Sequence, residues 1–370
     1  MPRLTIDLAK IKHNTSLIVE LLKPHGVKLS GVTKACLGNE LVGKAMLDGG
    51  AAGLADSRAE NIRNLRRHFQ GAELTLLRSS VTPEDACIEA DVYYVSSYEQ
   101  ALPLLRMSPH KPQKFCLLLE TGDGREGVPL ELASDEASRI AGLPEAVLVG
   151  LATNAACARI DVPVGVSLQS FNEAAARIAW RLRRGRMGCA GGGSAKAQDN
   201  ADDPVDLERM LPVMSVGGSG LLQLVTGPEE GGEQQPGWGM SLFAPVTELR
   251  CGEAILLGRI PSGQSPDLYL QGAHRDAFVL EGPVLEIFEK SGVNQALVGF
   301  GVQDTGGAGL IPCHPGITPA GMTSDYLAID CTSPELRAHP LRVGEAVRFL
   351  PTYYALLAAM TSPYVEKNFI

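Results

Sequence analysis

Residues Lys28–Asn39 read K-L-S-G-V-T-K-A-C-L-G-N. The apolar first part of this stretch predicts a strand, and the basic residue Lys34 stands where that strand ends. Gly38 and Asn39 follow closely and predict the start of a helix. A lysine at the exit of the first strand of an α/β barrel is a candidate Schiff-base residue, because its amine can attack a carbonyl carbon.

The same unit of apolar strand, polar residue and amphipathic helix recurs along the chain. Strands that alternate with helices predict a parallel sheet, and eight is the number that closes a (β/α)8 TIM barrel. The active site of such a barrel lies at the carboxyl ends of its strands. Eight strands are predicted, at Val27–Thr33, Ala51–Ala55, Glu73–Leu77, Val92–Val95, Lys114–Leu119, Val147–Ala152, Leu211–Val216 and Val246–Leu249.

The pattern changes after Gly258, where strands follow one another without helices between them. Glycine and proline punctuate this part, as they do in β structure. We therefore expect an α/β protein with two domains, a TIM barrel over residues 9–262 and a second, mostly β domain over residues 263–370 that also takes in the N-terminal strand, residues 1–8. The strands predicted for the second domain are Thr5–Leu8, Phe278–Phe288, Ala296–Val302, Tyr326–Cys331 and Ala346–Leu350.

Composition narrows the class of partner. The chain has 370 residues, a formal net charge of −9 and an apolar fraction of 45%. This acidic balance argues against nucleic acid or an anionic membrane as a partner, and no apolar run is long enough to span a bilayer. The eight cysteines are scattered without a C-x-x-C pair, which argues against a zinc ribbon or a redox motif and fits a reducing compartment; we expect no metal. With no signal peptide visible, we expect a cytoplasmic protein that acts on a small molecule.

An ordered series of motifs gives a family resemblance. The chain resembles the alanine-racemase-like, fold-type III pyridoxal-phosphate enzymes, and within them the ornithine/lysine racemase-like branch. The resemblance runs from Leu4 to the C-terminus. The motifs are V-T-K-A (32–35), A-D-S-R-x-E-N (55–61), E-T-G-D-G-R-E-G-V (120–128), G-L-A-T-N-A-A-C (150–157), G-G-S-G (217–220), L-R-C-G-E-A-I-L-L-G (249–258), G-V-Q-D (301–304) and Y-Y-A-L-L-A-A-M-T-S-P-Y-V (353–365).

The resemblance implies a cofactor, pyridoxal 5′-phosphate, and residues that hold it. Lys34 is similar to the lysine to which the cofactor is attached, and Arg250 is similar to the arginine that faces the pyridine nitrogen. A guanidinium does not give up its proton, so that nitrogen stays unprotonated and the cofactor is a poorer electron sink, which favours reprotonation at Cα. Ser219 and the backbone amides near Gly252 and Glu253 resemble the phosphate cup.

Three further residues carry roles by the same resemblance. Tyr353 is similar to the tyrosine that reaches the phosphate from late in the chain. Asn154 takes the place of a histidine near the ring, and Arg125 resembles the arginine near the substrate carboxylate. The resemblance also implies a homodimer whose β domain supplies a second base. The family's tyrosine is missing from Ser291–Ala296, and the candidates for that base are Asp304, Cys313, His314 and Tyr326.

The leading hypothesis is therefore a pyridoxal-phosphate-dependent amino-acid racemase of the ornithine, lysine, alanine or serine class. A decarboxylase of the same fold is an alternative, against which Arg250 argues, and a non-catalytic carrier of the cofactor is another. A diamino acid would need an acidic partner for its distal amine. The sequence offers Glu120, Asp123, Glu253 and Asp325 for that role.

Overall fold

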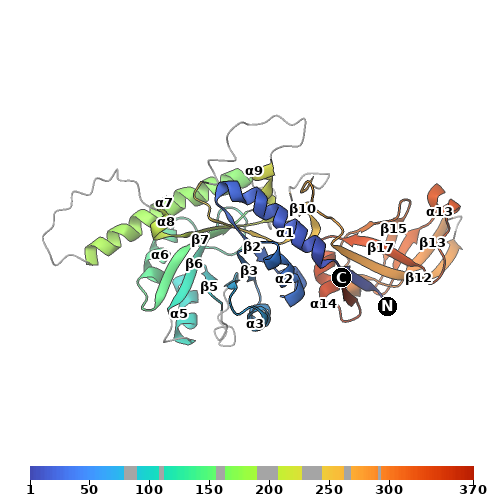
Figure 1. Ribbon diagram of the computed structural model, residues 1–370, viewed down its shortest axis with the longest axis horizontal. Coiled ribbons are helices and arrows are strands. Elements are labelled where there is room, and N and C mark those ends of the chain that lie inside the picture. The colour runs from blue at the N-terminus through green and yellow to red at the C-terminus, as the bar shows by residue number, and fades with distance from the viewer. Residues whose placement is uncertain are drawn as a thin grey trace.

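The structure of the chain is a computed structural model. It describes residues 1–78, 90–107, 112–155, 163–189, 207–226, 244–261, 268–290 and 293–370. Two bodies of secondary structure lie side by side in Figure 1, a barrel wrapped by helices and a mostly antiparallel sheet. Both chain ends lie beside the sheet.

A closed parallel barrel forms the larger body, as the sequence predicts. Its strands all pair in parallel with their neighbours, and β9 returns to β2 with Ser30 opposite Arg250. The barrel strands are β2 (Lys28–Val32), β3 (Gly53–Asp56), β4 (Glu73–Leu76), β5 (Val92–Val95), β6 (Gln113–Leu119), β7 (Ala146–Asn154), β8 (Val213–Gly217) and β9 (Glu248–Cys251).

Helices cover the outside of this barrel because each buries one apolar face against the strands. The helical elements around the barrel are α1 (Leu8–Leu22), η1 (Lys23–His25), η2 (Lys34–Cys36), α2 (Glu40–Asp48), α3 (Ala59–His68), α5 (Tyr98–Met107), α6 (Ala133–Ala141), α7 (Val164–Cys189), α8 (Leu207–Met210), η3 (Ser219–Leu222), α9 (Gln223–Thr226) and α11 (Glu253–Leu257).

None of the helices in the described ranges combines the length and the apolar character that a bilayer-spanning helix requires.

The interior of the barrel holds a small cluster of its own. Side chains along a strand alternate between its two faces, so only every second residue points inward. The buried inward cluster consists of Val92, Tyr94, Cys116, Leu118 and Ala152. Polar side chains from β8 and β9 share this interior, and they matter for the site described below.

The second body is an eight-stranded sheet in the order β14-β17-β12-β13-β16-β15, to which β1 and β18 are joined through β12. The N-terminal strand pairs antiparallel with β12 and parallel with β18. The strands are β1 (Arg3–Ile6), β12 (Phe278–Lys290), β13 (Val293–Val298), β14 (Leu310–Pro312), β15 (Thr318–Met322), β16 (Leu327–Asp330), β17 (Ala346–Pro351) and β18 (Glu366–Phe369); β10 (Arg259–Ile260) and β11 (Leu268–Tyr269) form a separate ribbon.

Most predicted strand bounds differ slightly from the structure, and two strands of the second body end two or more residues earlier than predicted. The first strand ends at Ile6 rather than Leu8, because the side chain of Asp7 accepts from the amide of Lys10 and caps α1. The predicted strand Ala296–Val302 ends at Val298, and Val302 begins the short helix α12 (Val302–Thr305). The predicted domain boundary at residues 262 and 263 lies outside the described residues.

Helices α12, α13 (Pro334–Ala338) and α14 (Tyr353–Thr361) accompany the sheet. Helix α14 carries the last predicted motif and contacts η2, the turn that bears Lys34. This contact brings a segment from the end of the chain to the turn that follows the first barrel strand, and Figure 1 shows α14 where the barrel and the sheet meet.

Candidate active site

Lys34 lies at the carboxyl end of β2, where the barrel rule places a site. It is half-buried in the short turn η2, which begins after Thr33. The turn closes on Leu37 and Gly38, both with positive φ (54° and 61°). The side chain of Asn39 then accepts from the amides of Leu41 and Val42, so Gly38 and Asn39 open α2 as predicted.

A buried carboxyl group ties this turn to the next barrel unit. Thr33 Oγ1 donates to Asp56 Oδ2 at 2.7 Å. Asp56 Oδ1 accepts from the amide of Arg58 at 2.9 Å and from Asn61 Nδ2 at 3.0 Å. Burial raises the pKa of Asp56, although each of these hydrogen bonds lowers it. The backbone that presents Lys34 is therefore fixed from both sides.

Arg250 is a buried cation at the end of β9, with only 3% of its surface exposed. Its Nη1 donates to Tyr94 Oη at 3.2 Å and to Ser215 Oγ at 2.7 Å. Its Nη2 donates to the carbonyl oxygen of Thr153 at 2.8 Å and to Asn154 Oδ1 at 3.0 Å. Four of the five N–H groups of the guanidinium are thus used. The fifth, on Nε, has no partner among the residues that the structure describes.

The side chains behind Arg250 were not identified from the sequence. Ser215 Oγ donates to Glu248 Oε1 at 2.9 Å, and the Tyr94 ring lies 4.8 Å from the guanidinium carbon. Glu248 and Arg250 are two residues apart on one strand, so both face the barrel interior. A charged pair at this spacing in an otherwise apolar strand is a signal that the sequence does contain.

Asn154 connects Arg250 to the loop after β6. Its Nδ2 donates to Glu126 Oε1 at 3.4 Å while its Oδ1 accepts from Arg250. The structure therefore joins Asn154, Arg250 and the loop of residues 120–128, all of which the motifs single out. This loop is closed at its base by two backbone hydrogen bonds: the amide of Glu120 donates to the carbonyl oxygen of Val128 at 3.0 Å, and the amide of Val128 donates to that of Leu118 at 2.8 Å.

Arg125 lies in the same loop, and its side chain forms an ion pair there. Its Nε lies 2.5 Å from Asp123 Oδ2, and its amide donates to Glu120 Oε2 at 3.0 Å. Glu120 also accepts from the amide of Gly122. Gly127 has φ 140°, and a Cβ there would lie 2.6 Å from the backbone nitrogen of Glu120. The loop is thus held in one shape by its own acidic side chains and glycines.

Ser219 stands at the end of β8 beside the start of α11. Its Oγ accepts from the amide of Ala254 at 3.1 Å and lies 3.2 Å from Cys251 Sγ. Burial raises the pKa of the Cys251 thiol to about 11, so this group stays protonated at neutral pH. Gly252 precedes α11, and Glu253 uses its side chain in an ion pair with Arg259 at 2.6 Å.

Tyr353 is half-buried at the first position of α14, the helix that contacts η2. Its ring packs edge to face on Tyr354, with 5.7 Å between the centroids. The chain end thus reaches the Lys34 turn through the helix that Tyr353 begins.

The four candidates for a second base lie in the C-terminal sheet region. Asp304 is buried and caps α12 by accepting from the amide of Gly301 at 3.1 Å, and it also accepts from Ser362 Oγ. Cys313, His314 and Tyr326 are exposed. Within the described ranges, no hydrogen bond or ion pair joins any of the four to Lys34 or Arg250.

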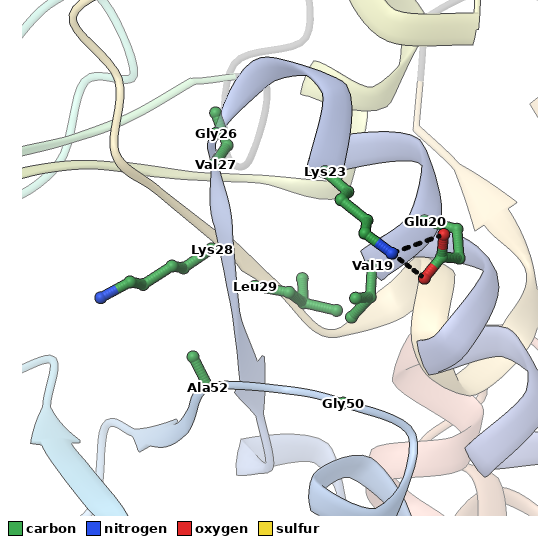
Figure 2. A pocket seen from close by; sticks show the side chains of 9 residues that line it. All are labelled: Val19, Glu20, Lys23, Gly26, Val27, Lys28, Leu29, Gly50 and Ala52. Atoms are coloured by element: carbon green, nitrogen blue, oxygen red, sulfur yellow. Dashed lines mark hydrogen bonds and ion pairs between the residues drawn. The ribbon is translucent and has the colours of Figure 1, made fainter.

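A hollow at the opposite end of the barrel is separate from the candidate active site. Figure 2 shows it between the end of α1, the start of β2 and the turn before β3. Lys23 there pairs with Glu20 at 3.3 Å, while Lys28 points away from both. These residues lie at the amino ends of the strands, opposite the end that carries Lys34 and Arg250.

Comparisons with known proteins agree with this architecture. The family described as "Alanine racemase, N-terminal domain" matches residues 6–209. A lysine racemase of Thermotoga maritima is 27% identical over 393 residues, covering 99% of this chain and 98% of its own. An ornithine racemase of Acetoanaerobium sticklandii is 24% identical, covering 100% and 99%. A crystal structure of alanine racemase from Corynebacterium glutamicum shares the fold, with a TM-score of 0.69, 16% identity and coverage of 100% and 99%.

Proposed function

This chain belongs to the alanine racemase family and is an amino-acid racemase, and we propose that it works with pyridoxal 5′-phosphate held by Lys34 and takes a basic diamino acid. The observation that carries the cofactor assignment is the fixed guanidinium of Arg250, which stands on β9, the barrel strand next to β2, and β2 leads into the turn that bears Lys34.

The donor set fits both ends of the cofactor. A pyridine nitrogen without a proton is an acceptor, and the Nε–H of Arg250 is the donor that no described residue uses. A phosphate dianion needs hydroxyl and amide donors. The hydroxyl of Ser219 and the amides at Gly252 and Glu253, where α11 begins, offer both types in one place, while the amide of Ala254 already donates to Ser219 Oγ. Tyr353 adds a phenol from α14.

When bound, the cofactor acts as an electron sink that lowers the barrier to removing the Cα proton of an amino acid. Lys34 anchors it and then takes or returns that proton on one face. Arg250 keeps the ring nitrogen unprotonated, which limits the electron sink and favours return of the proton to Cα. Arg125 contributes a cation near the substrate carboxylate. These roles are proposals that rest on the resemblance and on the positions of the side chains.

The substrate class follows from the relatives and from the acidic groups at the barrel rim. The two relatives are named for lysine and ornithine, which carry a second amine. Of the four acids named from the sequence, Asp123 and Glu253 are already ion-paired, Glu120 caps its own loop, and Asp325 accepts from Gln303 and Ser324 in the C-terminal sheet region. Glu126 was not among them, and within the described ranges its side chain accepts one hydrogen bond, from the neutral amide of Asn154. We assign Glu126 to the distal ammonium of the substrate.

The protein is proposed to be a cytoplasmic homodimer, with the second base supplied by the partner copy. The carboxylate of Asp304 is buried and caps α12 by accepting from the amide of Gly301. The other three candidates for the second base are exposed, namely Cys313, His314 and Tyr326. Five described cysteines are free thiols, the usual state in a reducing compartment. They are Cys36, Cys116, Cys251, Cys313 and Cys331.

Absorbance of the purified protein with pyridoxal 5′-phosphate tests the cofactor assignment. We expect a visible band in the native protein and in Lys44→Ala, an exposed lysine on α2 that pairs with Asp48. The band should be lost in Lys34→Ala, because the covalent attachment is lost. A Lys34→Ala protein that keeps the band would overturn the role of Lys34.

A further inference from the structure

Arg250 is a cation buried inside the barrel. Within the described ranges, no carboxylate lies within ion-pair distance of its guanidinium, and its four hydrogen bonds go to neutral oxygens. Removing a charge from water is costly unless other groups compensate for it. Something near Arg250 must therefore balance its charge and hold its long, flexible side chain in one place.

Glu248 is the carboxyl group that a hydrogen-bonded side chain connects to Arg250. Ser215 Oγ accepts from Arg250 Nη1 at 2.7 Å and donates its own proton to Glu248 Oε1 at 2.9 Å. A hydroxyl has one proton and two lone pairs, so it serves both partners at once. Cation, hydroxyl and carboxyl therefore form a chain of two hydrogen bonds inside the barrel.

Tyr94 completes the arrangement from β5. Its hydroxyl accepts from Nη1 at 3.2 Å, and its ring face lies 4.8 Å from the guanidinium carbon, which adds a cation–π contact. Burial raises the pKa of Tyr94 well above its ordinary value, so the ring stays neutral. Its neutral hydroxyl is therefore available to accept from Arg250.

The charges of these groups influence one another. Burial raises the pKa of Glu248, while Arg250, Ser215 and Lys28 lower it and Glu73 raises it. The positive charge of Arg250 lowers the pKa of both Tyr94 and Cys116, and Glu248 raises both. The ionisable side chains inside the barrel are therefore electrostatically coupled to Arg250.

We propose that Glu248, acting through Ser215, and Tyr94 are positioning residues that fix the guanidinium of Arg250 so that only its Nε–H faces the ring nitrogen of the cofactor. This inference rests on the proposed function, because it needs a ring nitrogen at Arg250. None of the three side chains is assigned to touch the cofactor; each acts through Arg250.

The test is a double-mutant cycle on cofactor binding. Ser215→Ala, Glu248→Gln and the double variant are titrated with pyridoxal 5′-phosphate, and the dissociation constant and the absorbance maximum of the bound cofactor are measured. We expect each single variant to bind about tenfold more weakly, as for loss of a hydrogen bond to a charged group. The double variant should also lose about tenfold rather than a hundredfold, because Glu248 acts on Arg250 only through Ser215, so removing its charge and removing the hydroxyl abolish the same effect. The absorbance maximum should shift in all three.

Control variants distinguish loss of the positioning of Arg250 from a general disturbance of packing inside the barrel. Thr75→Ser alters a buried polar residue of β4 and should change neither the dissociation constant nor the absorbance maximum. If Glu248→Gln does not fold, Glu248→Asp replaces it in the cycle, because the shorter side chain draws the carboxylate away from Ser215. Tyr94→Phe removes the other hydrogen bond to Nη1, which is separate from this chain, and should by itself weaken binding and shift the absorbance maximum. Single variants that bind and absorb like the native protein would overturn the inference, and so would losses that multiply between the variants at Ser215 and Glu248. A native protein that gives no band would instead overturn the proposed function.

Discussion

Gly217 lies directly against the guanidinium of Arg250. A Cβ on Gly217, the last residue of β8, would lie 2.5 Å from Arg250 Nη2 and 2.8 Å from Asn154 Oδ1. Four hydrogen bonds hold that guanidinium, so it cannot move aside as the end of a free arginine would. The absence of a side chain at Gly217 is what makes room for the cation.

Gly217→Ala should therefore displace Arg250 and weaken both folding and cofactor binding. Overpacking of this kind costs about 1–3 kcal/mol in the free energy of unfolding. Urea unfolding and titration with pyridoxal 5′-phosphate measure the two effects. Gly71→Ala is the matched control, because a Cβ there meets nothing within 4 Å. Equal behaviour of the two variants would contradict the close packing of Gly217 and Arg250.

Glu126→Gln tests the assignment of the distal ammonium. The variant should lose about tenfold in kcat/KM for lysine or ornithine, because a hydrogen bond to a charged group is weakened. Activity with 2-aminohexanoic acid, which has the lysine chain without the amine, should change little. Glu131→Gln alters a nearby exposed carboxylate and serves as the control. A loss that is equal for both substrates would remove Glu126 from the recognition of the amine.

Ser219→Ala tests the phosphate cup. Ser219 Oγ lies beside the start of α11, so its loss should weaken binding of pyridoxal 5′-phosphate by about tenfold. Binding of pyridoxal, which lacks the phosphate, should be unaffected. Ser167→Ala removes another buried hydroxyl, on α7, and should leave both ligands unchanged. If pyridoxal and its phosphate lose affinity equally, Ser219 does not hold the phosphate.

The buried carboxyl of Asp56 predicts a pH dependence of stability. Burial raises its pKa above the ordinary 3.8, so the folded protein holds this proton more tightly than the unfolded chain does. The free energy of unfolding should therefore fall as the pH rises from 3.8 through the raised pKa. Urea unfolding across that range should show a smaller fall in Asp56→Asn.

The control for Asp56 is Asp48→Asn. The hydrogen bond from Lys44 lowers the pKa of Asp48, so its contribution is lost only as the pH falls below 3.8. Asp48→Asn should leave the fall above 3.8 unchanged. An Asp56→Asn protein with the native slope would show that Asp56 does not titrate in this range.

The barrel was readable from sequence because each of its strands is an apolar run followed by a polar residue and a helix. Strand Val92–Val95 was predicted to the residue, and the others differ by one or two residues at most ends. The C-terminal sheet was harder. Strand β15 (Thr318–Met322) is nearly all exposed, so it lacks the alternation that marks a half-buried strand.

The candidate site likewise contains residues that the sequence predicts and residues that it does not. Lys34, Asn154, Ser219 and Arg250 were predicted because each stands at the end of a barrel strand within a recognisable motif. Tyr94 and Ser215 were not predicted, because they lie within their strands, where the sequence gives only a run of strand residues. Glu248 was not predicted either, although its spacing from Arg250 places both side chains on one face of the strand. Their role depends on which strands meet across the interior, and strand-to-strand register is set by tertiary packing rather than by local pattern.

The measurement that tests the central claim most directly is deuterium incorporation at Cα. The native protein with pyridoxal 5′-phosphate is incubated in D2O with single enantiomers of lysine, ornithine, alanine and serine, and exchange and optical rotation are followed together. The account predicts exchange with loss of rotation for lysine or ornithine, at a higher kcat/KM than for alanine or serine. Bound cofactor with no exchange on any substrate, or release of CO2 in place of the opposite enantiomer, would contradict it.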